Sequence, residues 1–288
     1  MAANTTPTLD ELVSDVAAVP SLPLLYSRLD ETINHPRSSI ADIAKVLSED
    51  QGLAARILKL ANSPLFGYFS KIDTITQAVT IIGIQQVRDL ALAISVMGLF
   101  KGLPEDLITM ERFWRHSIGV ALAARVLATS QRETNLERFF VAGILHDIGR
   151  LVLFTRLPDL CRKIIEQAEA EQICRYEVER QVLGFDHADV GGALLRRWKL
   201  PIRVAEPVEY HHRCNQAGQF PRESAVLHCA DLLAHALNLD ESGDHTAPPL
   251  ITGSWERLAI SPFQLTLIVE QIDNQFNDIT RALQGAAS

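Results

Sequence analysis

The sequence of 288 residues has few cysteines and no paired-cysteine motif. Its four cysteines are scattered along the second half of the chain, without a C-x-x-C spacing: Cys161, Cys174, Cys214 and Cys229. This pattern argues against a disulfide scaffold and favours a reduced, intracellular protein. The first sixteen residues, MAANTTPTLDELVSDV, lack a basic segment followed by an apolar one, so we expect no signal peptide. These absences predict a cytoplasmic protein.

Long uncharged apolar runs and an excess of positive charge are also missing. The most apolar stretch, residues 78–100, is interrupted by Gln85, Gln86, Arg88 and Asp89, which makes it too polar to span a bilayer. The formal net charge of −8 at pH 7 argues against a diffuse surface for DNA or RNA. We therefore expect neither a membrane nor a nucleic acid among the partners.

Strand signals are absent as well. The chain has no convincing alternation of apolar and polar residues and no Asn-Gly or Asp-Gly hairpin turn. Hydrophobic residues make up 47% of it, and aromatic residues only 6%, which favours packed helices. Helical periodicity recurs, for example at Val87, Leu90, Ala91 and Ile94. The sequence predicts an all-α fold.

Proline, glycine and small polar residues divide the chain. We expect an N-terminal helical lobe over residues 1–102 and a histidine-rich lobe over residues 103–288. The clearest loop is ESGDHTAPPLITGS, residues 241–254. An amphipathic helix is predicted after it at residues 261–283, with Phe263, Leu267, Ile268, Ile272 and Phe276 as its apolar positions.

One apolar stretch holds a histidine and an aspartate side by side. His146 and Asp147 lie in GILHDIGRL, within a helix predicted from about Leu136 to Phe154. A buried carboxylate is costly unless a cation or hydrogen-bond donors compensate it. The pair is therefore either a hydrogen-bonded core pair or part of a metal or catalytic site. Gly149 lacks a side chain and would let another helix or a ligand come close.

A second adjacent pair, His211-His212, follows a short helix that begins near Pro201. Two neighbouring imidazoles suit two metals better than one, although a polar helix end is the alternative reading. Asp231 lies on a helix predicted over residues 224–237, and His228 and His235 share its face. Both histidines could position the Asp231 carboxylate, but the sequence favours a surface or near-surface position for His235.

Two single histidines complete the set. His116 lies in the long helical segment ERFWRHSIGVALAARVL, and His187 opens the segment HADVGGALLRRW with Asp186 as its expected N-cap. Taken alone, each fits an ordinary structural role. Taken in order, five imidazoles and two carboxylates suit iron, manganese or zinc, and they are enough for two divalent transition-metal ions sharing Asp147. The predicted ligands are His116, His146, Asp147, His187, His211, His212 and Asp231.

This ordered set resembles the H…HD…D signature of the HD superfamily of metal-dependent phosphohydrolases. Longer stretches resemble the HD-related output domain (HDOD) family of bacterial signalling proteins over about residues 16–240. These stretches are DQGLAARILKLANSPLFG (50–67), TITQAVTIIGIQQVRDLAL (74–92), VAGILHDIGRLVL (141–153), FDHADVGGALLRRWKLP (185–201) and EYHH (209–212). The resemblance implies an HD-like helical core preceded by an N-terminal helical lobe.

By position, the superfamily's first histidine matches His116, its HD doublet His146-Asp147, and its last aspartate Asp231. The binuclear HD-GYP phosphodiesterases add a middle histidine and an HH pair, matched here by His187 and His211-His212. Two departures argue against cyclic-di-GMP hydrolysis. Arg213 replaces the glutamate that follows the HH pair, with no GYP after it, and Arg150 replaces the lysine that follows HDIG.

Two functions follow from the resemblance. One is a regulatory output module of bacterial signal transduction that carries a binuclear metal site and acts through protein–protein contact, with its N-terminal lobe as the docking surface for a signalling protein. The other is a metal-dependent phosphodiesterase or phosphohydrolase acting on a nucleotide or cyclic dinucleotide. In that case Asp147 and Arg150 are the expected catalytic residues, and Arg150 would bind a phosphate-containing ligand.

Overall fold

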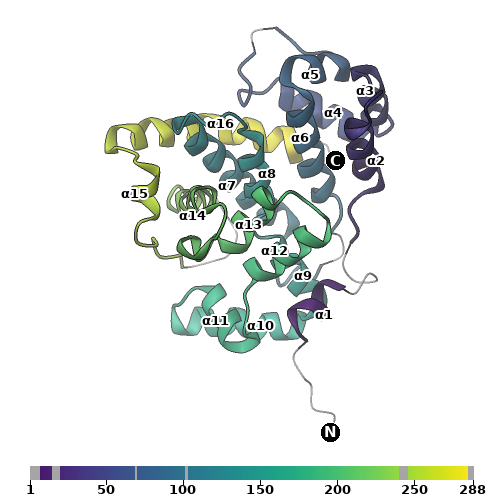
Figure 1. Cartoon of the computed structure of the whole chain (residues 1–288). Helices are drawn as coiled ribbons and strands as arrows, with labels where there is room; N and C mark the ends of the chain where they lie inside the picture. The colour runs from purple at the N-terminus through teal and green to yellow at the C-terminus, as the bar shows by residue number, and fades with distance from the viewer. Residues whose placement is uncertain (1–6, 15–19, 69, 101–102, 240–245, 285–288) are drawn as a thin grey trace.

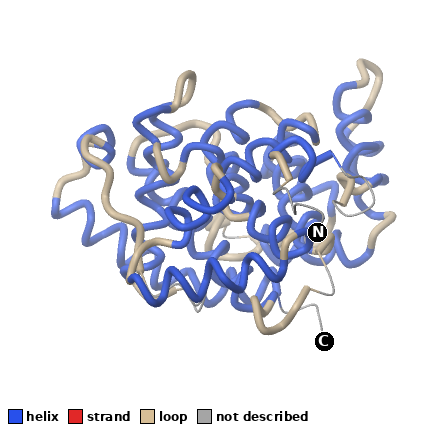
Figure 2. The backbone as a smooth tube through the Cα atoms, turned by 90° about the horizontal axis from the view of Figure 1, so that it is seen from below, coloured by secondary structure: helices blue, strands red, loops and turns tan. Residues whose placement is uncertain are grey.

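The computed structural model of the chain describes residues 7–14, 20–68, 70–100, 103–239 and 246–284. Every regular element in these ranges is helical, as Figures 1 and 2 show. The all-α prediction is therefore confirmed. Within the described residues no single helix is long and apolar enough to cross a membrane. Two consecutive helices, Ile75–Ile82 and Ile84–Met97, reach the length and hydropathy of a membrane span only when they are taken together. They are bent by 120° at their junction.

The elements follow one another closely along the chain. The first group is α1 (Leu9–Ser14), α2 (Leu24–Asn34), α3 (Ile40–Ser48), α4 (Gln51–Ala61), α5 (Ile75–Ile82) and α6 (Ile84–Met97). The second group is α7 (Met110–Ser130), α8 (Glu137–Leu145), α9 (Ile148–Arg156), α10 (Pro158–Glu171), α11 (Arg175–Leu183), α12 (His187–Arg197), α13 (Ile202–Tyr210), the 3₁₀ turn Cys214–Gln216, α14 (Pro221–Ala236), α15 (Ser254–Leu258) and α16 (Pro262–Gln284).

Short local signals set several helix ends. Ser39 caps α3 in a capping box, in which its hydroxyl accepts from the Asp42 N–H and the Asp42 carboxylate accepts from the Ser39 N–H. Gly83 separates α5 from α6 with a φ of 108°, a left-handed backbone conformation that favours glycine. The sequence therefore dictates both the start of α3 and the sharp bend after α5.

The long helix α7 lies at the centre of the molecule. Nearly all of its side chains from Phe113 to Ala128 are buried, and it packs against α8, α14 and α16. Gly143 of α8 permits a very close approach, because a Cβ there would lie 2.3 Å from the Cα of Ala121. One continuous hydrophobic core runs through the molecule, from Leu12 of α1 to Leu283 of α16.

The last helix, α16, lies against α7 and reaches α4 of the first group (Figure 1). Its bounds confirm the predicted helix, but its buried face is narrower than predicted. Ile268, Ile272 and Phe276 are buried, whereas Phe263 and Leu267 are 73% and 49% exposed. At about 100° per residue, the latter two lie nearly opposite Ile272 on the helix, so they could not share its face.

The division into two lobes stays a prediction. Its boundary at residue 102, and the start of the resemblance at about residue 16, lie outside the described residues. Helices α2 to α6 pack mainly on one another. By contrast, α1 lies on α9 and α12, next to the histidine-rich part of the molecule (Figure 1).

Candidate metal centre

The seven predicted ligands lie together in the molecule, although they come from widely separated segments. His116 belongs to α7, His187 opens α12, and Asp231 belongs to α14. The two adjacent pairs lie directly after α8 and α13: His146-Asp147 and His211-His212. All seven residues are buried, and His212, at 8%, is the most exposed of them. We refer to them as the histidine–aspartate cluster.

The prediction of one continuous helix from about Leu136 to Phe154 is wrong. Helix α8 ends at Leu145 and α9 begins at Ile148, so that His146 and Asp147 form the turn between them. Asp147 has φ −98° and ψ 8°, outside the helical region, and its carbonyl accepts a bond from the Arg150 N–H at 2.8 Å. This break places His146 and Asp147 in a turn and not within a helix.

Gly149 brings α12 against the turn. A Cβ at this position would lie 2.0 Å from the carbonyl oxygen of His187 and 2.7 Å from the backbone nitrogen of Gly191. The expected close approach is therefore made by another helix. It places His187 directly beside Asp147.

The Oδ2 atom of Asp147 faces a first group of ligands. It lies 3.4 Å from His146 Nε2 and 3.9 Å from His116 Nε2. Asp231 Oδ1 joins them at 3.3 Å from His116 Nε2, and the two Nε2 atoms are 3.2 Å apart. A metal–nitrogen bond of about 2.1 Å places adjacent ligand atoms roughly 3 Å apart, so these spacings suit a shared ion.

The Oδ1 atom of Asp147 faces a second group. It lies 3.1 Å from His187 Nε2 and 3.9 Å from His211 Nε2. His212 Nε2 lies 2.9 Å from His187 Nε2, and one nitrogen from each of the three histidines falls within 4.8 Å of the others. Asp147 thus presents one oxygen to each group, as a carboxylate that bridges two metals does.

Several atoms of the cluster lack the partners that burial demands. Among the described residues, both carboxylate oxygens of Asp147, Asp231 Oδ1 and His211 Nε2 are buried and make no hydrogen bond. Leaving such groups unsatisfied costs free energy, and bound cations compensate it. The donor set of imidazoles and carboxylates therefore fits transition-metal ions.

The outer ring nitrogens show which tautomers the histidines adopt. His146 Nδ1 lies 2.7 Å from the Gly143 carbonyl oxygen, and His211 Nδ1 lies 2.7 Å from that of Val208. A carbonyl can only accept, so both Nδ1 atoms carry the proton and both Nε2 lone pairs point into the cluster. Metal-binding histidines are typically held in this way.

Glu179 of α11 fixes the Nδ1 proton of His187 in the same way. Its Oε2 atom accepts from both the backbone N–H and the ring Nδ1 of His187, each at 2.7 Å. No sequence pattern singles out Glu179, because it lies eight residues before His187 in a stretch without a motif. Its 3% exposure, seen only in the folded chain, marks it as part of the site.

His235 is a further addition. Its Nε2 lies 3.5 Å from Asp231 Oδ1, its ring centroid lies 5.1 Å from that of His116, and its side chain is only 7% exposed. His235 therefore lies beside the Asp231 carboxylate and is more buried than the surface or near-surface position that the sequence favours. His228 instead lies between the His211 carbonyl oxygen, 2.9 Å from its Nδ1, and the Ile251 N–H, which donates to its Nε2.

The two aspartates are held in the ionised form. Burial alone would raise the pKa of Asp147, but Arg150 and the neighbouring histidines outweigh it and hold that pKa well below its usual value. Burial likewise opposes ionisation of Asp231, yet His116, whose Nε2 lies 3.3 Å from Oδ1, and the charge of His235 hold its pKa well below the usual range. Metals require ligands in this charged state.

The histidines of the second group differ from one another in the direction in which their pKa is shifted. Burial and two histidine neighbours lower the pKa of His211 to about 3, and burial with the adjacent His211 lowers that of His212 far below its usual value. Burial would lower the pKa of His187 too, but Glu179 and Asp147 outweigh it and raise the pKa to about 10. Without metal, His187 therefore carries the proton of this group.

The arginines predicted to matter lie at the edges of the cluster. Arg150 is buried, and its Nε is 3.1 Å from Asp147 Oδ2, so its guanidinium lies against the carboxylate. Its proposed role in binding phosphate stays a prediction. Arg213, the residue in place of the expected glutamate, pairs with Asp186 and Asp189 in the first turn of α12.

Several known proteins are similar to this chain in sequence and fold. The HDOD domain profile matches residues 19–214. An HDOD domain protein of unknown function from Geobacter sulfurreducens is 28% identical, with a TM-score of 0.74 over 93% of each chain. A candidate phosphohydrolase from Shewanella amazonensis SB2B is 25% identical, with a TM-score of 0.67 over 96% of this chain and 93% of its own.

A curated relative extends beyond this chain. An uncharacterized protein from Treponema pallidum (strain Nichols) is 24% identical over 215 residues, which are 74% of this chain and 41% of that protein. The chain thus spans less than half the length of this relative.

The fold and the cluster define an all-helical protein built around buried histidine and aspartate side chains. Because the profile match covers most of its length, the chain belongs to the HDOD domain family.

Proposed function

We propose that this HDOD protein is an output module of signal transduction whose histidine–aspartate cluster binds two transition-metal ions. The observation that carries the proposal is Asp147, a buried carboxylate with one oxygen facing each of two ligand groups. The first ion would be held by His116, His146, Asp147 and Asp231. The second would be held by Asp147, His187, His211 and His212.

The burial of the cluster favours regulation over catalysis. A phosphodiester must touch the metals to be hydrolysed, yet every proposed ligand is at most 8% exposed. A substrate could reach them only after the surrounding helices move. A buried metal pair instead ties together the helices that supply its ligands, and its state can alter their packing.

The partner would bind at the N-terminal helices. Apolar side chains are exposed there, among them Leu24 at 75%, Ile81 at 41% and Tyr68 at 44%. Exposed apolar groups of this size are typical of protein interfaces when they lie close together. We therefore keep α2 to α5 as the proposed docking surface for a signalling protein.

The second candidate is a metal-dependent phosphodiesterase or phosphohydrolase. The complete ligand set and the likeness to the candidate phosphohydrolase of Shewanella amazonensis favour it. Paired metals would supply an activated water and stabilise charge on the phosphate oxygens. Asp147 would hold both metals, and Arg150 would have to leave the Asp147 carboxylate to bind a phosphate.

Metal analysis together with an activity screen separates the two. We expect purified protein, expressed with iron, manganese and zinc supplied, to contain close to two ions per chain. Asp147→Ala should lose both, whereas Asp273→Ala, at an exposed position of α16, should keep them. Fewer than about half an ion per wild-type chain would contradict the metal centre.

The activity screen uses cyclic and linear dinucleotides with the same three proteins. Metal without turnover across the panel supports the output module. Hydrolysis that is present in wild type and Asp273→Ala but lost in Asp147→Ala would replace it with the phosphodiesterase.

A further inference from the structure

A cavity of about 530 Å³ lies where α4, α6, α7 and the last turn of α16 meet. None of the seven proposed metal ligands is among its lining residues. Its walls are mainly apolar and include Met97, Phe100, Met110 and Trp114. Cavities of this size, lined by apolar and aromatic groups with few polar ones, are typical of small-molecule sites. Methionine side chains adapt readily to the shape of a ligand.

One cation lines this apolar cavity. Among the described residues, Arg56 of α4 makes no hydrogen bond or ion pair, although its Nε is buried. A guanidinium carries five donors and is always charged, so Arg56 offers donors to a ligand at the wall of this apolar cavity. A carboxylate satisfies such a group with two parallel hydrogen bonds.

Among the described residues that line the cavity, Glu111 is the only carboxylate, and it does not pair with Arg56. Glu111 is exposed at the surface, in the first turn of α7, where the partial positive charge of the helix N-terminus stabilises it. No ion pair joins it to Arg56 in the described part of the chain. No described residue therefore supplies an acceptor to Arg56, and its guanidinium is available to a ligand in the cavity.

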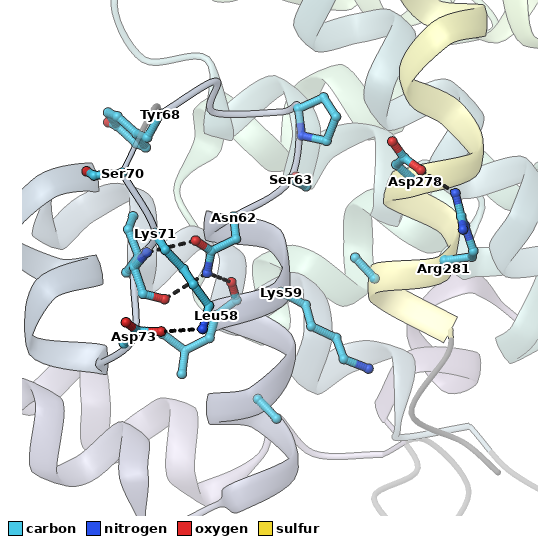
Figure 3. A pocket seen from close by; sticks show the side chains of 14 residues that line it. Leu58, Lys59, Asn62, Ser63, Tyr68, Ser70, Lys71, Asp73, Asp278 and Arg281 are labelled. Atoms are coloured by element: carbon cyan, nitrogen blue, oxygen red, sulfur yellow. Dashed lines mark hydrogen bonds and ion pairs between the residues drawn. The ribbon is translucent and has the colours of Figure 1, made fainter.

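A larger cleft, also lined by α4 and α16, has among its described residues no cation at an apolar wall. It measures about 970 Å³, and Figure 3 shows several of its polar side chains paired with each other or with the backbone. Asn62 bonds to the backbone of Leu58 and Ile72, and Lys71 pairs with Asp73 at 2.8 Å. Lys59, three residues after Arg56, points into this open cleft and is exposed. It is therefore a matched control for Arg56.

We propose that the cavity binds a small apolar monocarboxylate, with its carboxylate on Arg56 and its apolar body between Met97, Met110 and Trp114. This site is separate from the histidine–aspartate cluster and does not depend on whether the cluster is catalytic. It lies where the N-terminal helices meet α7 and α16, so an occupant would contact both groups of helices at once.

Calorimetric titration of the full-length, metal-loaded protein tests the site. The probes are octanoate and 1-naphthoate, each compared with its uncharged analogue, 1-octanol and 1-naphthylmethanol. We expect at least one carboxylate to bind at one site per chain with a Kd below about 1 mM, and about 10-fold tighter than its alcohol. Quenching or shift of the Trp114 fluorescence by octanoate should be lost in Trp114→Phe.

Variants locate the carboxylate. Arg56→Leu should weaken binding about 10-fold or more, Lys59→Leu should leave it unchanged, and Glu111→Gln should leave it equal or tighter because a nearby negative charge is removed. Failure of both carboxylates to bind, equal binding of the alcohols, or equal loss in Arg56→Leu and Lys59→Leu would overturn the proposal. Should Arg56→Leu not fold, Arg56→Gln and the comparison of acid with alcohol on wild type decide it.

Discussion

Glu179 accepts two hydrogen bonds from His187, one from its backbone N–H and one from its ring, through a single carboxylate oxygen. The ring bond fixes the proton on Nδ1 and turns Nε2 toward Asp147, 3.1 Å from its Oδ1. A carboxylate in this place also makes the imidazole a stronger ligand. At the scale of single residues, Glu179 would therefore increase the metal affinity of the proposed second position.

Glu179→Gln should lower the affinity of the protein for its metals about 10- to 100-fold, since it removes the charge but keeps the size of the side chain. Competition against a chromogenic chelator measures this affinity. Glu166→Gln, an exposed position on α10, is the control and should match wild type. Equal affinities for all three proteins would show that Glu179 has only a structural role.

Metal uptake should release a proton from His187. Its pKa of about 10 in the metal-free protein lies above the ordinary 6.5, so His187 is protonated at pH 7.5 and must lose that proton to bind a metal. The raised pKa stabilises the metal-free fold below about pH 6.5, and this contribution is lost as the pH rises through about 10.

Calorimetry of metal binding in two buffers with different ionisation enthalpies counts the released protons. We expect about one proton per chain from this group at pH 7.5, and a metal affinity that increases as the pH rises from 6.5 toward 10. Binding with no proton release would contradict the charged state of His187.

At the scale of elements, the contact between α9 and α12 decides whether the cluster forms. Gly149 lies against the backbone of His187, and the capping box of Asp186 and Asp189 fixes the first turn of α12. Arg180 and Arg213 pair with both aspartates of this capping box. The start of α12 is thus held from both sides, which fixes the position of its first residue, His187.

Gly149→Ala should separate α9 from α12, because its Cβ would lie 2.0 Å from the His187 carbonyl oxygen, a rigid backbone atom. Overpacking of this kind costs about 1–3 kcal/mol of the free energy of unfolding. We expect a melting temperature several degrees lower and a loss of bound metal. Gly98→Ala, where the nearest atom is 3.6 Å away, is the control. A wild-type melting temperature and metal content in Gly149→Ala would show that α9 and α12 can separate without harm.

At the scale of the whole molecule, the proposed metals would connect α7, the α8–α9 turn, α12, the end of α13 and α14. These elements share one hydrophobic core with the N-terminal helices, and α16 contacts both α7 and α4. A change at the cluster can therefore reach the N-terminal helices through packed side chains. This continuity is what an output module requires.

Removal of metal should destabilise the molecule unevenly. Ligands that bind only the folded state stabilise it, so chelation should lower the melting temperature. Hydrogen exchange should then increase most in α7, α12 and α14 and least in α2 and α3, which supply no ligand. Uniform protection before and after chelation would contradict a structural role for the metals.

The sequence predicted the helical class, the last helix and the identities of the seven residues in the cluster. It could not predict the break at His146-Asp147, because the local pattern is apolar and helical on both sides of it. Nor could it reveal Glu179, whose role depends on a contact between α11 and α12. The prediction that Phe263 and Leu267 belong to the apolar face of the last helix was wrong. Helical geometry alone, at about 100° per residue, would have placed them away from Ile272.

The sequence by itself determined which groups are available, since the order and types of histidine and aspartate are fixed by the chain. Only the tertiary structure decided how they are used. It gave each oxygen of Asp147 its own group of histidines and buried both groups. It also placed Arg56, which has no partner among the described residues, at the wall of a separate cavity. The physical reason is that helical periodicity acts over a few residues, whereas ligand convergence and burial depend on contacts between helices far apart in the chain.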